Sequence, residues 1–393
     1  MRLPEVYLRT YRSSFHQWIY AKMVRRPDRN LAPGTLVRVL NKDGSFTCIG
    51  IYNPLSTIAI RVLSITDAPT GPVFFRERIK AARRLREDIL QLTAHSDSYR
   101  LIHSESDGLP GLIIDRYGSH FLVKPYSSGY QGQVMDSIVE ALCAVFPGAQ
   151  VHVASDEKAC TRDHVSYVAE ERKYPVKGAR PLITENDLSF QVDLAGGQKT
   201  GYFLDQKLNR KLAADVARGE DVLDLYCYTG GFGIHCLKSG AKSAIGVDLD
   251  PLALEIARQN ARRNGVTMEF HCLDVFEHLK ETVASGKKYG LVIADPAKLA
   301  SVKAEVSRAV KTFGDLNELA IRAVKPGGLL FTFSCTGMIS GKIFQSVVFT
   351  AAQNARANLR VLYNVGPSPD HPYSSAFPEG RYLHGLLMQV DPA

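Results

Sequence analysis

The chain has 393 residues, of which 45% are hydrophobic, so it is long enough to bury the cores of two or three domains. It contains no apolar stretch of about 18 residues, which argues against a membrane span, and its N-terminus lacks the apolar segment of a secretory signal. Seven cysteines, an odd number without a C-x-x-C pair, favour reduced thiols over a disulfide framework or a zinc site. We therefore expect a cytoplasmic protein with no metal centre.

The net charge of +8 is unevenly distributed along the chain. Residues 1–100 hold 17 Lys and Arg against 8 Asp and Glu, whereas the remainder holds 31 against 32. A basic end on a near-neutral body favours a polyanion such as nucleic acid as the partner of that end. A solvated basic surface explains the same charge.

The first region, residues 1–67, has short runs typical of β-strands at 34–41, 46–53 and 58–64. Turns rich in Gly, Pro, Asn and Asp separate these runs. The pattern predicts a small β-barrel or sandwich.

The second region, residues 68–185, is predicted to be a small α+β domain. Its first segment, residues 72–95, has apolar residues at helical spacing and several arginines, Arg86 among them, on the other face. Those arginines either contact RNA or form a solvated face. Three strand-like runs, a helix and a further strand follow, at 99–105, 111–118, 120–126, 131–146 and 150–156.

From residue 186 to 393, strands alternate with helices, which predicts a parallel, doubly wound sheet. A buried strand at 222–226 leads into the glycine-rich turn T-G-G-F-G, and a second strand ends at Asp248. Such a turn lets a ligand approach the backbone, and Asp248 is placed to accept hydrogen bonds from ribose hydroxyls. Dinucleotide sites and S-adenosylmethionine sites share these two features.

Three details favour S-adenosylmethionine over a dinucleotide. Asp224 stands just before the turn, where a carboxylate repels a diphosphate but attracts a sulfonium cation. The turn also lacks G-x-G-x-x-G and is crowded by aromatic residues. Asp274 follows the third strand, where an acidic side chain can bind the adenine amino group, although it is equally placed to cap the next helix.

Two further residues are expected at the carboxyl edge of the sheet, where open α/β folds place reacting groups. Asp295 ends the fourth apolar strand, and Cys335 follows the apolar run LLFTFS of the fifth. A cysteine at such a position is often just a small buried side chain. A thiol and a carboxylate on neighbouring strands favour a nucleophile with its catalytic neighbour, and we predict that both residues are catalytic.

The sequence resembles the bacterial RlmI-type family of large-subunit ribosomal RNA 5-methylcytosine methyltransferases over nearly its whole length. The resemblance rests on the order and spacing of several stretches together. They are QKTGYFLDQKLNR (198–210), LDLYCYTGGFG (223–233), ADPAK (294–298), FSCTG (333–337), ESDGLPGLIIDRYG (105–118) and DHPYSSAFPEGRYLHG (370–385).

The resemblance implies an N-terminal PUA-like RNA-binding β-barrel, the α+β middle domain and a Rossmann-like class I methyltransferase domain. It implies S-adenosyl-L-methionine as cofactor, large-subunit ribosomal RNA as substrate, and leaves a homodimer open. In that chemistry Cys335 adds to carbon 6 of cytosine, Asp295 assists at the N3 edge, and Lys298 helps to lower the thiol pKa. The predicted cofactor-binding residues are Asp224, Tyr226, Thr229, Gly230, Asp248, Leu249, Asp274 and Asp295, with Lys199 and Tyr202 either covering the cofactor or forming an interdomain arm.

The sequence departs from the family pattern at one position, and three other functions remain as alternatives to cytosine methylation. Ala297 stands where the family usually has a second proline, which loosens the turn over the pocket. Methylation of uracil carbon 5 uses the same thiol, methylation of a guanine ring nitrogen needs none, and a non-catalytic RNA-binding protein needs no site at all. In the tail, Asp370-His371-Pro372 is expected to be structural rather than catalytic.

Overall fold

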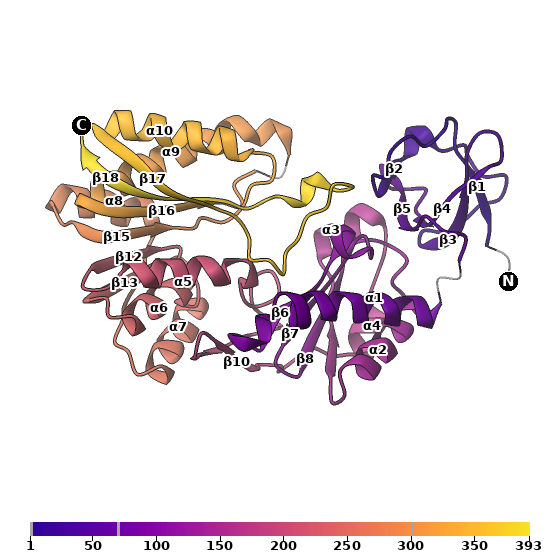
Figure 1. The fold of residues 1–393 in the computed structure, drawn as a ribbon, viewed down its shortest axis with the longest axis horizontal. Coiled ribbons are helices and arrows are strands. Elements are labelled where there is room, and N and C mark those ends of the chain that lie inside the picture. The colour runs from indigo at the N-terminus through magenta and orange to yellow at the C-terminus, as the bar shows by residue number, and fades with distance from the viewer. Residues whose placement is uncertain (1–2, 69–70, 301) are drawn as a thin grey trace. The chain divides into compact units, whose positions relative to one another are not determined.

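The computed structural model describes residues 3–68, 71–300 and 302–393, and these divide into two compact units (Figure 1). Unit 1 comprises the residues up to Thr184 together with Val192–Tyr202 and Pro369–Gly380. Unit 2 comprises Glu185–Gln191, Phe203–Ser368 and Arg381–Ala393. Two segments expected in the third region, 192–202 and 369–380, therefore group with unit 1. The division into three domains at 67 and 185 stays a prediction.

The N-terminal part of unit 1 is a five-stranded sheet around a small apolar core that includes Val37, Val39, Cys48 and Ile60. The three predicted strands are confirmed, and two short strands that were not predicted complete the sheet. In the order β1-β3-β4-β5-β2 the strands are β1 (Glu5–Tyr7), β3 (Thr35–Leu40), β4 (Phe46–Tyr52), β5 (Ile58–Ser64) and β2 (Trp18–Tyr20).

The middle part of unit 1 is a four-stranded sheet covered by helices. Its strands are β6 (Ser98–His103), β7 (Leu112–Tyr117), β8 (His120–Pro125) and β9 (Gln150–Val153), in that order. Its helices are α1 (Pro72–Arg84), α2 (Gln133–Val145), α3 (Glu157–Asp163) and α4 (Val168–Lys173). The α2 crossover makes β8 and β9 parallel, whereas the β6–β7–β8 meander is antiparallel.

The predicted helix over 72–95 is not one regular helix. It is α-helical to Arg84 and continues as a π-helical turn, Leu85–Ile89. The wider turn carries Arg86 inward, where it is 0% exposed and pairs with both carboxylate oxygens of Asp107 at 2.6 and 2.8 Å. A buried ion pair thus overrides the helical repeat, and both interpretations of Arg86, an RNA contact or a solvated side chain, are wrong.

Unit 2 is built on a seven-stranded sheet with the order β14-β13-β12-β15-β16-β18-β17, which confirms the doubly wound architecture. The first five strands in that order run parallel, and β18 is antiparallel to both of its neighbours. The strands are β12 (Asp221–Leu225), β13 (Ser243–Asp248), β14 (Glu269–Cys272), β15 (Tyr289–Ala294), β16 (Val324–Ser334), β17 (Ala357–Val365) and β18 (His384–Pro392).

Helices cover both faces of this sheet, because its central strands are continuous apolar runs that must be buried on both sides. Every residue of β15 is buried. One face carries α5 (Lys207–Val216), α6 (Gly231–Lys238) and α7 (Pro251–Arg263), and the other carries α8 (Val275–Ser285), α9 (Val306–Ala323) and α10 (Gly341–Ala355) (Figure 1). A hairpin of β10 (Leu182–Glu185) and β11 (Leu188–Gln191) precedes the sheet. None of the helices in the described ranges has the length and hydropathy that a bilayer crossing requires.

Candidate active site

The carboxyl ends of four parallel strands bring the predicted site residues of unit 2 to one edge of the sheet. Leu225 at the end of β12 is in register with Val247 on β13 and with Ala294 on β15, and Ala294 is in register with Thr332 on β16. The residues that follow these positions therefore share that edge. They are Tyr226, Asp248, Asp295 and Cys335.

The glycine-rich turn after β12 is held in left-handed backbone conformations. Tyr226, Tyr228 and Gly230 have φ values of +60°, +49° and +79°. A Cβ on Gly230 would lie 3.1 Å from Ile234 Cδ1, so glycine serves both the backbone angle and the close packing. The turn leads directly into α6, which begins at Gly231, so the N-terminus of this helix lies at the same edge of the sheet.

Asp224 lies beneath this turn and is 1% exposed. Its Oδ2 accepts a hydrogen bond from the Gly233 N–H at 2.9 Å. Burial, together with the nearby carboxylates of Asp295 and Asp248, raises the pKa of Asp224 to about 7, although the hydrogen bond from the Gly233 N–H acts in the opposite direction. An ionised Asp224 at this position would be stabilised by a cation, which fits a sulfonium ligand.

Asp248 has a fixed orientation at the end of β13. Its Oδ2 accepts from the Tyr228 N–H at 2.8 Å, and its Oδ1 accepts from the Asp250 N–H at 3.0 Å. Beside it, Leu249 is 62% exposed and Leu273 is 40% exposed. Leu273, which the sequence reasoning missed, is tied to this position because its N–H donates to the Asp248 carbonyl at 3.2 Å. Exposed apolar side chains next to Asp248, the carboxylate predicted to bind ribose, suit the face of an adenine ring.

Three other predicted cofactor residues, Asp274, Thr229 and Tyr226, differ in their burial and in their hydrogen-bond partners. Asp274 caps α8, with Oδ1 accepting from the Phe276 and Glu277 N–H groups at 2.9 and 3.2 Å, so its cap interpretation is confirmed and its adenine contact stays a prediction. Thr229 is buried, and its carbonyl accepts from Asn260. Burial raises the pKa of the Tyr226 hydroxyl.

Lys199 and Tyr202 lie in the 192–202 segment of unit 1 rather than in unit 2. Tyr202 is 2% exposed, and the Lys199 carbonyl accepts from the Lys124 ammonium group at 2.8 Å. Their contact with a cofactor stays a prediction.

The predicted catalytic residues follow the neighbouring strands β15 and β16. The Cys335 thiol donates to the Pro296 carbonyl oxygen at 3.6 Å, which places sulfur beside the backbone that immediately follows Asp295. Thr336 and Leu299 tie the same two loops together through a 3.2 Å hydrogen bond. Cys335 is partly exposed, whereas Cys227 and Cys236 of the same unit are buried.

Two buried amides that the sequence reasoning missed orient Asp295. Gln206 Nε2 donates to Asp295 Oδ2 at 2.9 Å, and Asn209 Nδ2 donates to Gln206 Oε1 at 2.6 Å. Asn209 also donates to the Gly366 carbonyl at 3.1 Å. Gln206 and Asn209 are three residues apart, a spacing that places side chains on one helix face and could have revealed them.

Lys298 follows the same strand end and is exposed. Its position is therefore open to an RNA phosphate or to the thiol of Cys335. Within the described ranges, no cluster of three or more possible metal ligands occurs.

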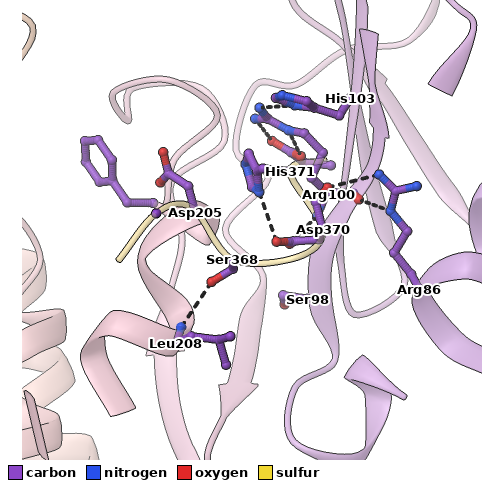
Figure 2. A network of polar contacts seen from close by, with 12 residues as sticks. Arg86, Ser98, Arg100, His103, Asp205, Leu208, Ser368, Asp370 and His371 are labelled. Carbon is purple, nitrogen blue, oxygen red and sulfur yellow. Dashed lines mark hydrogen bonds and ion pairs between the residues drawn. The ribbon is translucent and has the colours of Figure 1, made fainter. Parts of the chain in front are cut away.

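The Asp370-His371 motif of the tail is buried in unit 1 (Figure 2). Asp370 Oδ2 accepts from the Arg100 N–H at 2.9 Å, and Asp370 Oδ1 lies 2.9 Å from His371 Nδ1. Arg86 Nη2 donates to the Asp370 carbonyl at 3.0 Å. These contacts anchor the tail segment and favour the structural interpretation of the motif.

Comparisons with known proteins identify the family. A model of the S-adenosylmethionine-dependent methyltransferases matches residues 175–355, and a model of the PUA-like domain matches residues 13–65. Ribosomal RNA large subunit methyltransferase I of Photobacterium profundum and that of Aeromonas hydrophila are each 37% identical to the chain over 384 residues, with 95% of both chains covered. The chain belongs to the ribosomal RNA large subunit methyltransferase I family. The resemblance drawn from the sequence is thereby confirmed, as are the PUA-like domain and S-adenosylmethionine as cofactor.

Solved structures agree with this fold assignment. A chain assigned as a methyltransferase and complexed with S-adenosylhomocysteine is 20% identical, with a TM-score of 0.80 over 99% of this chain and 100% of its own. A second, from Streptococcus mutans, is also 20% identical, with a TM-score of 0.79 over 98% of this chain. At this identity the likeness shows the fold alone.

Proposed function

We propose that the protein methylates carbon 5 of a cytosine in large-subunit ribosomal RNA through a covalent adduct with Cys335. The observation that carries the proposal is the position of the thiol, 3.6 Å from the Pro296 carbonyl and next to Asp295 at the sheet edge. The class of RNA comes from the name of the relatives, which does not state the methylated atom. A homodimer, left open by the sequence, enters no step of the proposal.

The chemistry explains the need for a thiol. Carbon 5 of cytosine is too weak a nucleophile to take a methyl group directly. Addition of the Cys335 thiolate to carbon 6 makes carbon 5 enamine-like. After methyl transfer to carbon 5, a base removes the carbon 5 proton, the carbon 5–carbon 6 double bond re-forms, and the thiolate leaves with the bonding electrons of the sulfur–carbon bond.

Asp295 is our candidate for the group that assists this addition. Its Oδ2 accepts from Gln206 Nε2, which fixes the orientation of the carboxyl group that we propose hydrogen-bonds the N3 and N4 edge of the base. The Gln206–Asn209 chain therefore positions the carboxylate instead of touching the base. Lys298, exposed at the same strand end, is placed to favour the thiolate form of Cys335.

The cofactor supplies an electrophilic methyl group on a sulfonium cation when it is bound. We propose that Asp248 accepts from its ribose hydroxyls and that Leu249 and Leu273 contact its adenine ring. Gly230 and Thr229 belong to the turn that approaches it, and buried Asp224 favours its positive charge. Tyr226, Asp274, Lys199 and Tyr202 complete the proposed set.

Cys335 also discriminates among the alternatives. Methylation of a guanine ring nitrogen needs no thiol at the sheet edge, and a non-catalytic RNA-binding protein needs no aligned carboxylates. Methylation of uracil carbon 5 uses the same thiol, so only product analysis separates it from the cytosine reaction. Ala297 is exposed next to Pro296, and its effect on the choice of base is tested by the same analysis.

The adduct itself provides the test. With 5-fluorocytosine in the RNA, carbon 5 has no removable proton, so elimination stalls after methyl transfer. We expect the protein to form a denaturant-resistant RNA adduct that requires S-adenosylmethionine, detected as a mobility shift, and Cys335→Ala to form none. Mass spectrometry of nucleosides from unmodified RNA should show 5-methylcytosine as the product.

Cys143→Ala is the matched control, because Cys143 is an exposed thiol on α2 of unit 1. This variant should form the adduct as the parent protein does. Cys335→Ala should bind cofactor normally and lose at most about 1–2 kcal/mol of unfolding free energy. Methyl transfer by Cys335→Ala at a near-normal rate would overturn the proposal and favour nitrogen methylation.

A further inference from the structure

A cleft of about 430 Å³ lies within unit 1, and its walls come from both parts of that unit. The β2–β5 side of the N-terminal sheet contributes Trp18 and Arg61, and the middle part contributes Glu105, Tyr126 and Arg162. Trp18 is the single tryptophan of the chain. Neither the family assignment nor the proposed reaction gives this cleft a role.

The indole ring of Trp18 is held in one orientation. Its Nε1–H donates to Glu105 Oε1 at 2.7 Å, and Phe377 packs edge-on against the ring at a centroid distance of 4.9 Å. The Arg61 guanidinium lies 5.8 Å from the ring centroid. A partly exposed indole held by three neighbours is a preorganised surface on which a planar base can stack.

Arg61 is 7% exposed, yet its pairing is incomplete. Its Nη1 is 3.4 Å from Glu105 Oε1, and its Nη2 is 3.8 Å from Asp163 Oδ2, beyond hydrogen-bonding distance. Across the described residues, Arg61 Nε and Nη2 donate to no protein acceptor. Both nitrogens remain accessible at the cleft, where they can donate to an anion or to water.

Two other groups on the cleft wall complete the pattern. Arg162 has a 62% exposed side chain and adds a second guanidinium, anchored by a 3.3 Å hydrogen bond to the Tyr126 carbonyl. Glu105 is 5% exposed, and while its Oε1 is occupied, its Oε2 accepts no hydrogen bond from the described part of the chain. The cleft therefore offers a flat apolar surface, two cations and one buried acceptor.

We propose that this cleft binds one unpaired nucleotide of the RNA substrate. The base stacks on Trp18, the phosphate lies between Arg61 and Arg162, and Glu105 Oε2 accepts from an exocyclic amino group of the base. All of these residues belong to unit 1, whereas Cys335 and Asp295 belong to unit 2, so the cleft shares no residue with the proposed catalytic pair. The inference rests on the proposed function only in taking RNA as the ligand.

Because Trp18 is the sole tryptophan, its fluorescence reports on the cleft without a label. The full-length protein is titrated with a short single-stranded oligoribonucleotide of mixed sequence, with the same sequence as a duplex, and with cytidine monophosphate. We expect saturable quenching by the single strand that weakens as salt is raised, and much weaker quenching by the duplex. Unchanged fluorescence with the single strand overturns the proposal. Equal affinity for cytidine monophosphate would reassign the cleft to a free nucleotide and overturn it for RNA.

Variants test the individual contacts. Arg162→Gln should weaken single-strand binding roughly tenfold and reduce the salt slope by about one. Arg172→Gln, which removes another exposed arginine of unit 1, should leave binding unchanged. Equal effects of the two substitutions would show a general charge effect and overturn the specific site.

Labelled RNA measures the contribution of the indole once the tryptophan is removed. Trp18→Ala should weaken binding roughly 10- to 100-fold in fluorescence anisotropy, and Trp18→Phe should recover most of that loss because a ring remains. A melting curve confirms that each variant is folded. Failure of Trp18→Phe to bind better than Trp18→Ala would rule out stacking.

The fluorescence test of the cleft does not depend on the methylation chemistry. RNA should quench the Trp18 fluorescence of the Cys335→Ala variant to the same extent as that of the parent protein. If no 5-fluorocytosine adduct forms but RNA still quenches Trp18 fluorescence, the nucleotide site is supported and the proposed cytosine reaction is contradicted. If the adduct forms but RNA does not quench the fluorescence, the proposed reaction is supported and the proposed nucleotide site is contradicted.

Discussion

At the scale of single residues, burial of Asp224 raises the pKa of its carboxyl group, and this should make the binding of a cationic ligand depend on pH. Its pKa of about 7 means that the protonated and ionised forms are about equally populated near neutral pH and that the anion predominates above it. S-adenosylmethionine has a sulfonium cation, whereas S-adenosylhomocysteine is a neutral thioether there. We therefore expect the ratio of their affinities, measured by calorimetry between about pH 6 and pH 8, to shift toward S-adenosylmethionine as pH rises.

Variants separate this effect from other titrations. Asp224→Asn should flatten the pH dependence of the affinity ratio. Asp221→Asn should retain it, because Asp221 lies at the opposite end of the same strand, where its carboxylate accepts from the Ser243 hydroxyl at 2.6 Å. If the affinity ratio of the parent protein does not change with pH, Asp224 does not contact the sulfonium.

At the scale of elements, the amides that orient Asp295 come from the start of α5: Gln206 is its N-cap residue and Asn209 lies in its first turn. A buried ion pair anchors this helix to the β10–β11 hairpin. Arg210 Nε and Nη2 donate to the Glu185 oxygens at 2.6 and 2.9 Å, and both side chains are at most 3% exposed. Burial by itself would raise the pKa of Glu185, but the attraction of Arg210 outweighs it and the pKa is lowered. The pair is thus charged when the protein is folded.

Removing one partner should leave a buried charge without its counter-ion. We expect Arg210→Met to cost about 3–5 kcal/mol of unfolding free energy in urea titrations, while Arg210→Met with Glu185→Leu recovers most of the loss. Equal stabilities of the single and double variants would show that the charges do not interact.

At the scale of the whole molecule, the chain visits each unit more than once, and unit 1 is completed by residues near the C-terminus. Asp370 is 0% exposed and contacts Arg100 and His371 within unit 1 (Figure 2). Asp370→Ala should therefore lower the stability of unit 1 by about 1–3 kcal/mol, seen as faster hydrogen exchange at the Arg100 amide. Tyr373→Ala, at a 52% exposed position of the same segment, should leave that exchange rate unchanged.

Much of unit 2 and of its site could be predicted because the relevant signals are local. A run of apolar residues followed by a glycine turn specifies a strand, a turn and a helix within about 20 residues. In a parallel sheet the carboxyl ends of the strands meet at one edge, so sequence order alone brings Asp224, Asp248, Asp295 and Cys335 together. The family motifs lie in these same stretches, and the relatives confirm the family.

The remaining features depend on contacts between residues far apart in the chain. The inward turn of Arg86 needs Asp107 opposite it, and Gln206 becomes a positioning residue only when it meets Asp295, 89 residues later. Trp18 is an isolated aromatic residue until the fold places Glu105, 87 residues away, against its indole nitrogen. The sequence by itself determined the alternation of strands and helices and which residues stand at the carboxyl ends of the strands, because local pattern and chain direction suffice for both. Only the tertiary structure decided which buried charges pair and which are left to face a ligand, because pairing depends on distances that no local pattern encodes.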